Sequence, residues 1–376
     1  MPSSSLHVLV AGAGPTGLAL ATALRAGGAT VTLLDRQAAG ANTSRAAVVH
    51  ARTLEVLEGL GVTGALLGRG LRVGRFTVRD RDDVLMPVEF DRLPTPYPFT
   101  LMLSQAETEA ILLERFTALG GQVTRPVAVT GLAEDADGVT VTCDDGVERR
   151  GDYLVGADGG HSVVRERSGI AFEGGSYAES FSLADVRLGG GVPGDEVVLY
   201  FSPAGMVVVA PLPGGIHRIV AAVDEAPEHP SAAFVQSLLD QRGPGRERAP
   251  VEAVLWGSRF RVQHRVAARY RAGRVLLAGD AAHVHSPAGG QGMNTGIQDA
   301  IVLAAALLAG EPGLAAYEAR RRPVAERVVR LTDRLTRLAT VSEGLRPWRN
   351  RVLRAAAHVP SVRRALAWQL AGLAHR

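Results

Sequence analysis

The chain has 376 residues, 46% of them hydrophobic and 21% charged, which is typical of a soluble globular protein large enough for more than one lobe. All 41 basic residues are arginine, which excludes Schiff-base catalysis and the Walker-type phosphate loop, because both need a lysine. The formal net charge is only +3 and the arginines are spread along the chain, so we expect no nucleic-acid partner.

The N-terminus, Met1 to Leu6, runs almost directly into the first strand, without the basic and apolar segments of a secretory signal. No apolar run reaches the roughly 18 residues that a membrane helix requires. The single cysteine, Cys143, excludes an internal disulfide framework. We therefore expect a cytoplasmic protein without a membrane span.

The first 35 residues have the pattern of a β-α-β unit. In chain order its parts are an apolar run at 7–11, Gly12-Ala13-Gly14-Pro15-Thr16-Gly17, a helical segment from Leu18 to Ala26, and a strand from Thr30 to Leu34. Gly12 permits a tight turn, Gly14 lets a pyrophosphate approach the backbone, and Gly17 lets helix and strand pack closely. Asp35 follows the second strand, where a carboxylate accepts hydrogen bonds from ribose hydroxyls. This unit indicates a dinucleotide site but leaves FAD and NAD both open.

Helices and strands are then interleaved along the chain. Helical segments are expected at Thr53–Leu60, Glu107–Leu119, Gly296–Leu308, Val324–Leu338 and Pro360–Leu373. Strands are expected between 71 and 100 and at Val127–Leu132, Val139–Cys143, Tyr153–Ala157, Glu196–Phe201, Met206–Pro211, Ile216–Val223 and Arg274–Ala278. The alternating strands between 181 and 262 indicate an antiparallel sheet.

Two later segments complete a set of three motifs. Asp158-Gly159-Gly160 ends a strand and is followed by Ser162 and Arg165. Gly279-Asp280 ends another strand, and the glycine-rich stretch from Ser286 to Asn294 opens a helix. Such a turn offers bare backbone N–H groups to an electron-rich acceptor.

With these three motifs in order, the sequence resembles the class A flavoprotein monooxygenases, the family of para-hydroxybenzoate hydroxylase and the aromatic polyketide hydroxylases. The resemblance implies a bound FAD, NADPH or NADH as a transient reductant, and molecular oxygen as co-substrate. The reaction it implies is hydroxylation of an aromatic or polycyclic, polyketide-like molecule through a flavin C4a-hydroperoxide. Many polyketide hydroxylases of this class carry a thioredoxin-like third domain, and the chain resembles a short form without it.

The resemblance also implies roles for individual residues. FAD would be bound by Gly12, Gly14, Pro15, Thr16, Gly17, Asp35, Arg36, Arg45, Gln105, Val129, Asp158, Asp280, Pro287, Gly290, Gly292, Met293 and Asn294. Within this set, Asp280 would bind a ribityl hydroxyl, and the backbone from Gly290 to Asn294 would stabilise negative charge on the reduced flavin. The nicotinamide route would pass Arg45 and Arg165, with Arg45 as the one candidate for a catalytic side chain. The substrate pocket would be lined by Tyr200, Ala210, Leu212 and Pro287.

The substrate is expected to be neutral where it meets the inserted sheet. In benzoate hydroxylases of the family a strand of this sheet presents an arginine to the substrate carboxylate, and the matching position here is Leu212. The preceding residues Val207 to Ala210 are also apolar, so a buried carboxylate would remain unpaired, which is costly. A register shift toward Arg218 on the next strand is the alternative.

The fold class that follows is α/β. A Rossmann-like FAD-binding domain would comprise 1–75, 101–180 and 265–325, an inserted antiparallel-sheet substrate domain 76–100 and 181–264, and C-terminal helices 326–376. Three other functions stay open: an epoxidase or Baeyer–Villiger oxygenase, an oxygen-independent flavin reductase, and a binding protein with a degenerate site. His283 and His285 alternate but lack further ligands at metal-binding spacing, so no metal is expected. The oligomeric state is left open.

Overall fold

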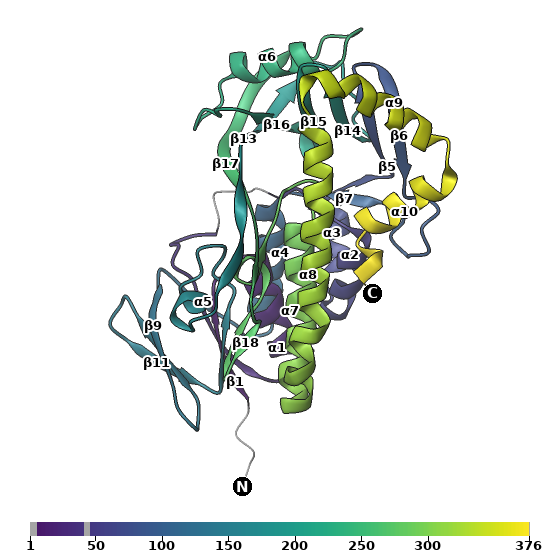
Figure 1. The fold of residues 1–376 in the computed structure, drawn as a ribbon. Helices are drawn as coiled ribbons and strands as arrows, with labels where there is room; N and C mark the ends of the chain where they lie inside the picture. Colours follow the sequence, from purple (N-terminus) through teal and green to yellow (C-terminus); the bar gives the residue numbers. More distant parts are fainter. Residues whose placement is uncertain (1–5, 41–45, 376) are drawn as a thin grey trace.

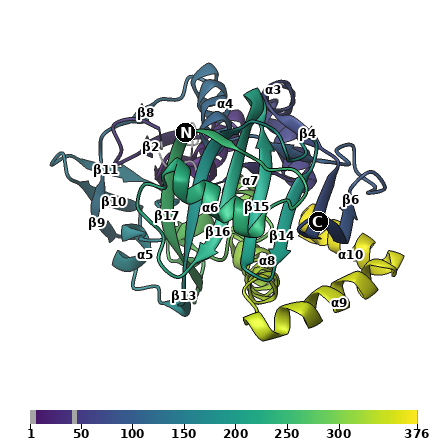
Figure 2. The same ribbon diagram turned by 90° about the horizontal axis from the view of Figure 1, so that it is seen from above.

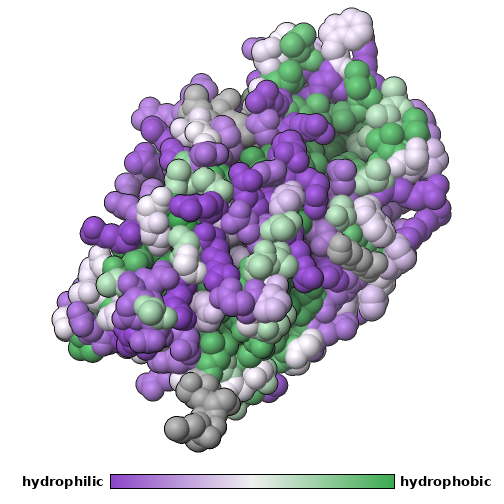
Figure 3. Space-filling model, turned by 60° about the horizontal axis from the view of Figure 1, so that its bottom comes forward, coloured by the Kyte–Doolittle hydropathy of each residue, from purple (hydrophilic) through white to green (hydrophobic). Residues whose placement is uncertain are grey.

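The computed structural model describes residues 6–40 and 46–375, and it has the expected α/β architecture (Figure 1). A mostly parallel sheet with helices lies in the lower half of the view, and a largely antiparallel sheet lies above it. Arg45, predicted beside the flavin, is outside the described residues. Figure 3 shows hydrophilic side chains interspersed with small apolar patches over the lower face, as is common for a protein in water.

The lower sheet has six strands and contains the predicted β-α-β unit. In spatial order the strands are β18 (Arg271–Ala272), β19 (Val275–Leu277), β12 (Tyr153–Gly156), β1 (His7–Ala11), β2 (Thr30–Leu34) and β8 (Val123–Thr124). All pairs are parallel except β18 with β19. Val8, Leu9 and Val10 at the centre are fully buried, which explains the unbroken apolar run in the sequence.

Helices cover this sheet. They are α1 (Pro15–Ala26), α2 (Ala51–Leu57), α3 (Thr63–Arg69), α4 (Gln105–Ala118), α5 (Val163–Arg167) and α7 (Gly292–Ala309). The sequence predicted no segment of membrane length, but α7 is long and apolar enough to cross a membrane. However, 61% of this helix is buried inside the protein. The burial arises because α7 packs between α1 and α8 (Glu311–Ala339), so it is the core helix of this half.

The upper sheet has eight strands. In spatial order they are β20 (His283–Val284), β17 (Val251–Ala267), β13 (Phe172–Leu188), β16 (Ile216–Val223), β15 (Gly205–Leu212), β14 (Val197–Ser202), β5 (Arg75–Asp80) and β6 (Asp83–Glu89). β13 and β17, each 17 residues long, were not predicted. The predicted domain boundaries at 180 and 264 fall inside these two strands.

One face of this sheet is covered by α6 (Ala232–Arg242), a helix that was not predicted (Figure 2). Because side chains alternate along a strand, successive residues of β15 face opposite sides. Val207 and Val209 are 0% and 1% exposed under α6, whereas Val208 between them is partly exposed on the face turned toward the lower half. The sheet therefore has one fully covered face and one less covered face.

Two small sheets and several short turns complete the α/β part. The sheets are β11 (Glu148–Gly151), β10 (Val139–Cys143) and β9 (Val129–Glu134), and β3 (Val48–Val49), β7 (Thr100–Met102) and β4 (Leu71–Val73). The 3-10 turns are η1 (Glu58–Leu60), η2 (Pro213–Gly215), η3 (Gly279–Ala281), η4 (Glu343–Leu345) and η5 (Leu373–His375).

The C-terminal part consists of α8, α9 (Arg346–Ala357) and α10 (Pro360–Leu370). The helix expected from Val324 to Leu338 is the second half of α8, which continues through Pro323. Burial of Tyr317 and Val328 on either side shows that packing outweighs the hydrogen bond lost at Pro323. α8 runs alongside both the lower and the upper sheet in Figure 1, and the predicted boundary at 325 falls within this one helix.

Candidate functional site

The glycine turn between β1 and α1 combines two tightly packed glycines with one open glycine. Gly12 has φ +99, and a Cβ there would lie 2.3 Å from Ala157 O; a Cβ on Gly17 would lie 1.8 Å from Gly12 O. No atom lies within 4 Å of the corresponding position on Gly14, which is the N-cap of α1 and provides no side-chain cap. Gly14 therefore leaves open space beside the start of α1, whose first N–H groups have no side-chain cap, and this arrangement fits a pyrophosphate.

Asp35 holds this turn from the end of β2. Its Oδ2 accepts a hydrogen bond from Ala13 N at 2.7 Å, and its Oδ1 accepts one from Gln37 N at 2.8 Å. Its backbone oxygen accepts from Val127 N at 2.8 Å, which brings the strand before Val129 beside it. Carboxylate oxygens have further lone pairs, so a ribose hydroxyl could still be bound here. Arg36 is exposed next to it.

Asp158 acts on its own loop. Its carboxylate accepts from Ser162 Oγ at 2.5 Å and from Val164 N at 3.1 Å, so it satisfies the N-terminus of α5. Burial, only partly offset by these hydrogen bonds, raises the pKa of Asp158. The structure thus places Asp158 as an organiser of the turn that ends β12.

Arg165 joins this turn to the third motif. Its Nη2 donates to Gly160 O and its Nη1 to Ala281 O, both at 2.9 Å, and its guanidinium lies 3.8 Å from the centre of the Phe172 ring. Only 9% of the residue is exposed. These contacts favour a positioning role over the predicted contact with nicotinamide, because backbone and ring occupy the guanidinium.

Thr16 lies where the first and third motifs meet. A Cβ on Gly279 would lie 2.5 Å from Thr16 Oγ1, and a Cβ on Gly296 in α7 would lie 2.4 Å from the same atom. Asp280, next to Gly279, is exposed on η3. The close packing of these glycines on Thr16 brings the turn that carries Asp280 against the start of α1.

The loop before α7 is fixed from three sides. Asn294 Nδ2 donates to Val48 O at 2.8 Å and to Gly290 O at 2.7 Å, and its Oδ1 accepts from His50 N at 2.8 Å. His50 Nε2 donates to the adjacent Gly289 O, and burial lowers the pKa of His50 to about 4, so the ring is neutral. All of these hydrogen bonds of the Asn294 side chain are therefore to backbone atoms of the protein. Gln291, the N-cap residue of α7, provides no side-chain cap.

Sequence reasoning missed His50 and Gln291. Gln291 Nε2 donates to Leu370 O at 3.0 Å, which ties the end of α10 to the same loop. The local sequence around a glutamine in a glycine-rich loop does not predict a hydrogen bond to a residue about 80 positions later, so only the structure reveals this contact.

The remaining predicted cofactor residues lie around these motifs. Gln105 Oε1 accepts from Ala46 N at 3.4 Å, beside the segment that would carry Arg45. Val129 is buried in β9, Met293 is partly exposed on α7, and Pro287 is exposed. The imidazole rings of His283 and His285 are stacked nearly parallel, with their centres 6.2 Å apart. No group of three metal-ligating side chains occurs among residues 6–40 and 46–375.

The predicted substrate residues lie on two different faces of the upper sheet. Ala210 and Leu212, each 6% exposed, pack in a cluster with Met102 of the lower half and Leu370 of α10. Tyr200 is 1% exposed and packs on the opposite face, among the residues under α6. The alternation along β14 thus directs the Tyr200 side chain away from the face that carries Ala210 and Leu212, with which it was predicted to line one pocket.

Arg218 lies opposite Ala210 on the neighbouring strand, and it is 3% exposed. Its Nε and Nη2 donate to the two carboxylate oxygens of Asp185 at 2.7 and 2.8 Å, and its Nη1 donates to Ala46 O at 3.0 Å. In a bidentate pair of this kind, the carboxylate balances the positive charge of the guanidinium. Arg218, the arginine to which a register shift of the predicted strand would point, is thus already paired.

Comparison with known proteins agrees with this arrangement. The FAD binding domain family matches residues 5–332. 6-Methylpretetramide 4-monooxygenase from Streptomyces rimosus is 41% identical over 357 residues, which cover 91% of this chain and 63% of that protein, so the chain spans less than two thirds of its length. Dialkyldecalin synthase from Streptomyces rugosporus is 34% identical over 82% of this chain and 66% of its own length.

Among solved structures, p-nitrophenol 4-monooxygenase PnpA from Pseudomonas putida DLL-E4 superposes with a TM-score of 0.87 at 25% identity, and the match covers 97% of both chains. The family match includes the glycine turn, both aspartate-glycine motifs and the inserted sheet. The chain belongs to the FAD binding domain family, and its relatives place it among the flavin-dependent monooxygenases.

Proposed function

We propose that this protein hydroxylates a neutral aromatic or polycyclic molecule, using FAD, molecular oxygen and NADPH or NADH. The observation that carries the proposal is the cofactor-facing side of the upper sheet. It presents Ala210 and Leu212, and Arg218 on the neighbouring strand is paired with Asp185. The relatives named as monooxygenases support the reaction type.

The residues of the site fit FAD. The open space at Gly14 and the uncapped start of α1 suit the pyrophosphate, and Asp35 suits the adenosine ribose. The exposed carboxylate of Asp280 suits a ribityl hydroxyl, and the N-terminus of α7 suits the electron-rich edge of the flavin. When bound, FAD supplies the redox and oxygen chemistry of the family.

The protein itself would position the cofactor, stabilise negative charge on it and exclude water from the reacting centre. Backbone N–H groups at Gly292 and Met293 would stabilise negative charge that develops on the cofactor, without any reorganisation, because Asn294 and His50 fix the loop. The upper sheet and α10 would cover the reacting centre and keep water out.

The proposed substrate class rests on the apolar side chains of the sheet face that carries Ala210 and Leu212. A carboxylate placed against Leu212 would lose its hydration without gaining the charge of Arg218, which Asp185 already pairs, whereas a phenol or a fused-ring ketone loses little. Apolar contact with Ala210, Leu212 and Val208 would favour a flat, extended ring system. This supports neutral polycyclic phenols over benzoates.

Reduction by NADPH or NADH is proposed on the resemblance of Arg45 and Arg165 to residues on the nicotinamide route. The contacts of Arg165 leave Arg45 as the stronger candidate for direct contact, because Arg165 is occupied by Gly160 and Ala281. Both reductants carry the same nicotinamide, so the choice between them is left to the assay.

The test is a panel of simple hydroxybenzoates and neutral polycyclic phenols with FAD-loaded protein. The proposal predicts that neutral phenols stimulate NADPH or NADH oxidation and are recovered as hydroxylated products. Efficient coupled turnover of a small benzoate, with no response to neutral compounds, would contradict the proposed substrate class. Stimulation without hydroxylated product would contradict the proposed reaction.

A further inference from the structure

We propose that Asp299 is a positioning residue for FAD: its buried carboxylate holds the turn that carries Asp280, and Arg321 holds Asp299 in place. The inference rests on the proposed function through FAD binding alone. It adds a second group of residues, on α7 and α8, to those that contact the cofactor in the proposal above, which are the glycine turn, Asp35, Asp280 and the N-terminus of α7.

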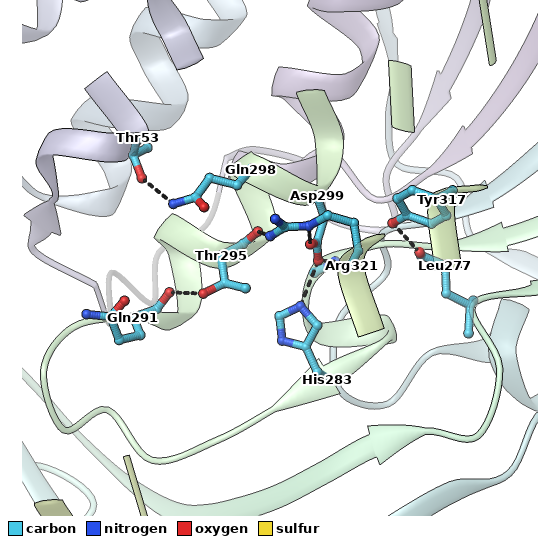
Figure 4. Close-up of polar contacts among 10 residues, drawn as sticks. Thr53, Leu277, His283, Gln291, Thr295, Gln298, Asp299, Tyr317 and Arg321 are labelled. Carbon is cyan, nitrogen blue, oxygen red and sulfur yellow. Dashed lines mark hydrogen bonds and ion pairs between the residues drawn. The ribbon is translucent and has the colours of Figure 1, made fainter. Parts of the chain in front are cut away.

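Asp299 lies at the centre of a fully buried polar network (Figure 4). Its Oδ2 accepts from His283 Nε2 at 2.7 Å and from Gly279 N at 3.2 Å, and its Oδ1 accepts from Arg321 Nε at 2.6 Å. Asp299 and Arg321 are 0% and 3% exposed, and His283 is 1% exposed. These contacts connect α7, α8, β20 and η3.

The two contacts on Oδ2 lie on either side of Asp280. Gly279 immediately precedes Asp280 and has φ +61, while His283 follows it by three residues. One carboxylate therefore fixes both ends of the turn, and the exposed Asp280 side chain projects from the part between them. Two anchors on one acceptor define the orientation of this turn more closely than a single hydrogen bond would.

The charge of Asp299 depends on its partners. Burial, the largest influence, would raise the pKa of the Asp299 carboxyl, but Arg321 and His283 outweigh it and lower the pKa below its usual value. A buried ion pair is seldom the most stable filling for a core, and the best-attested reason to keep one is the definition of a unique arrangement. The arrangement defined here is that of the Gly279–Asp280 turn.

Arg321 connects this arrangement to the C-terminal half. It also donates from Nη2 to Thr295 O at 3.3 Å, one turn before Asp299 on α7. The neighbouring Tyr317 donates its hydroxyl to Leu277 O at 2.9 Å, at the end of the strand that leads into the turn. α8 thus contacts both the strand that enters the turn and the carboxylate that holds it.

The test is Asp299→Asn, which keeps the size of the side chain and removes its charge. Apoprotein is titrated with FAD and, separately, with ADP, whose proposed contacts are limited to the glycine turn and Asp35. The inference predicts that the Kd for FAD rises about 10- to 100-fold, as loss of a charge-assisted hydrogen bond implies, while the Kd for ADP stays within about twofold. Unchanged FAD affinity, or an equal loss for FAD and ADP, would overturn it.

Glu196→Gln is the matched control. Glu196 is also a buried carboxylate, 1% exposed and paired with Arg75 and Arg79, but it lies directly before β14 of the upper sheet, away from the turn. Its loss should lower the melting temperature and leave the FAD and ADP affinities unchanged. A rise in the FAD Kd in this variant equal to that in Asp299→Asn would contradict the inference.

Arg321→Lys covers the case in which Asp299→Asn does not fold. A lysine keeps the cation beside Asp299 and loses the contact with Thr295, so FAD affinity should fall less than in Arg321→Gln, with ADP binding retained in both. Equal FAD affinity in these two variants and the wild type would overturn the inference. Failure of the wild-type protein to bind FAD would instead contradict the proposed function.

Discussion

Replacing Arg165 with alanine separates a positioning role from direct contact with nicotinamide. Arg165 is 9% exposed and donates to Gly160 O and Ala281 O, each at 2.9 Å, from a position 3.8 Å above Phe172. A hydrogen bond from a charged group contributes about 1.5–3 kcal/mol, so losing two predicts destabilisation by at least about 3 kcal/mol. Because these bonds join the turn after β12 to the turn that carries Asp280, we expect weaker FAD retention as well.

Arg167→Ala provides the matched control, since Arg167 is exposed on the same short helix, α5. Both variants are assayed for urea unfolding, for FAD affinity and for the rate of flavin reduction by NADPH at saturating FAD. The structure predicts that Arg165→Ala loses stability and FAD while Arg167→Ala keeps both. An Arg165→Ala protein with normal stability and FAD content but slow reduction would refute this reasoning and restore the nicotinamide role.

Three further predictions concern the glycine turn, the substrate face and the pH range. Gly12→Ala should abolish FAD binding and folding, since its Cβ would lie 2.3 Å from Ala157 O, whereas Gly14→Ala should keep the melting temperature of the apoprotein and weaken only FAD in titrations. Leu212→Arg should increase coupled oxidation with hydroxybenzoates relative to neutral phenols; no change in that ratio would contradict the assignment of the face. Burial lowers the pKa values of His50 and His285 to about 4, so both rings are neutral in the folded protein between pH 7 and pH 5. In the unfolded chain each histidine has its ordinary pKa of 6.5 and binds a proton over this range. The free energy of unfolding should therefore fall by about 2 kcal/mol for each histidine from pH 7 to pH 5, and urea titrations that show a flat profile would refute this.

The parts of the fold that depend on local pattern were predictable. β1, α1 and β2 follow from an apolar run, a glycine turn and a second apolar run, and the structure has all three close to the expected bounds. β13 and β17 were missed because they contain charged and glycine residues, and their length of 17 residues depends on pairing with each other and with β16 and β20.

The missed helix α6 explains why the sequence grouped Tyr200 with Ala210 and Leu212, which lie on the other face of the sheet. Its sequence carried the signals of a helix: Ser231 caps it by accepting from Phe234 N at 3.2 Å, and Gly243 ends it. Without that helix, the sequence alone could not say which face of β14 is fully covered. The side on which Tyr200 lies depends on this covering, because alternate residues of a strand face opposite sides.

The site was predictable where backbone chemistry demands glycine, and much less so where side chains act at a distance. Gly12 and Gly17 pack as their spacing indicates. Asp299 and Arg321 lie 22 residues apart on two helices, and no local pattern indicates that they meet. The partners of Arg218 and Arg165 are likewise set by tertiary packing, so their charges could be located but their roles could not be assigned.

The most direct test of the central claim is the fate of isotopically labelled oxygen. FAD-loaded protein is supplied with oxygen-18 gas, NADPH or NADH, and a neutral polycyclic phenol that stimulates oxidation of the reductant, and the product is analysed by mass spectrometry. A flavin-dependent hydroxylase inserts one atom of the labelled gas into the product for each reductant consumed in a coupled cycle. A product formed without the label, whether reduced or rearranged, would contradict the account and assign this chain a different chemistry on the same fold.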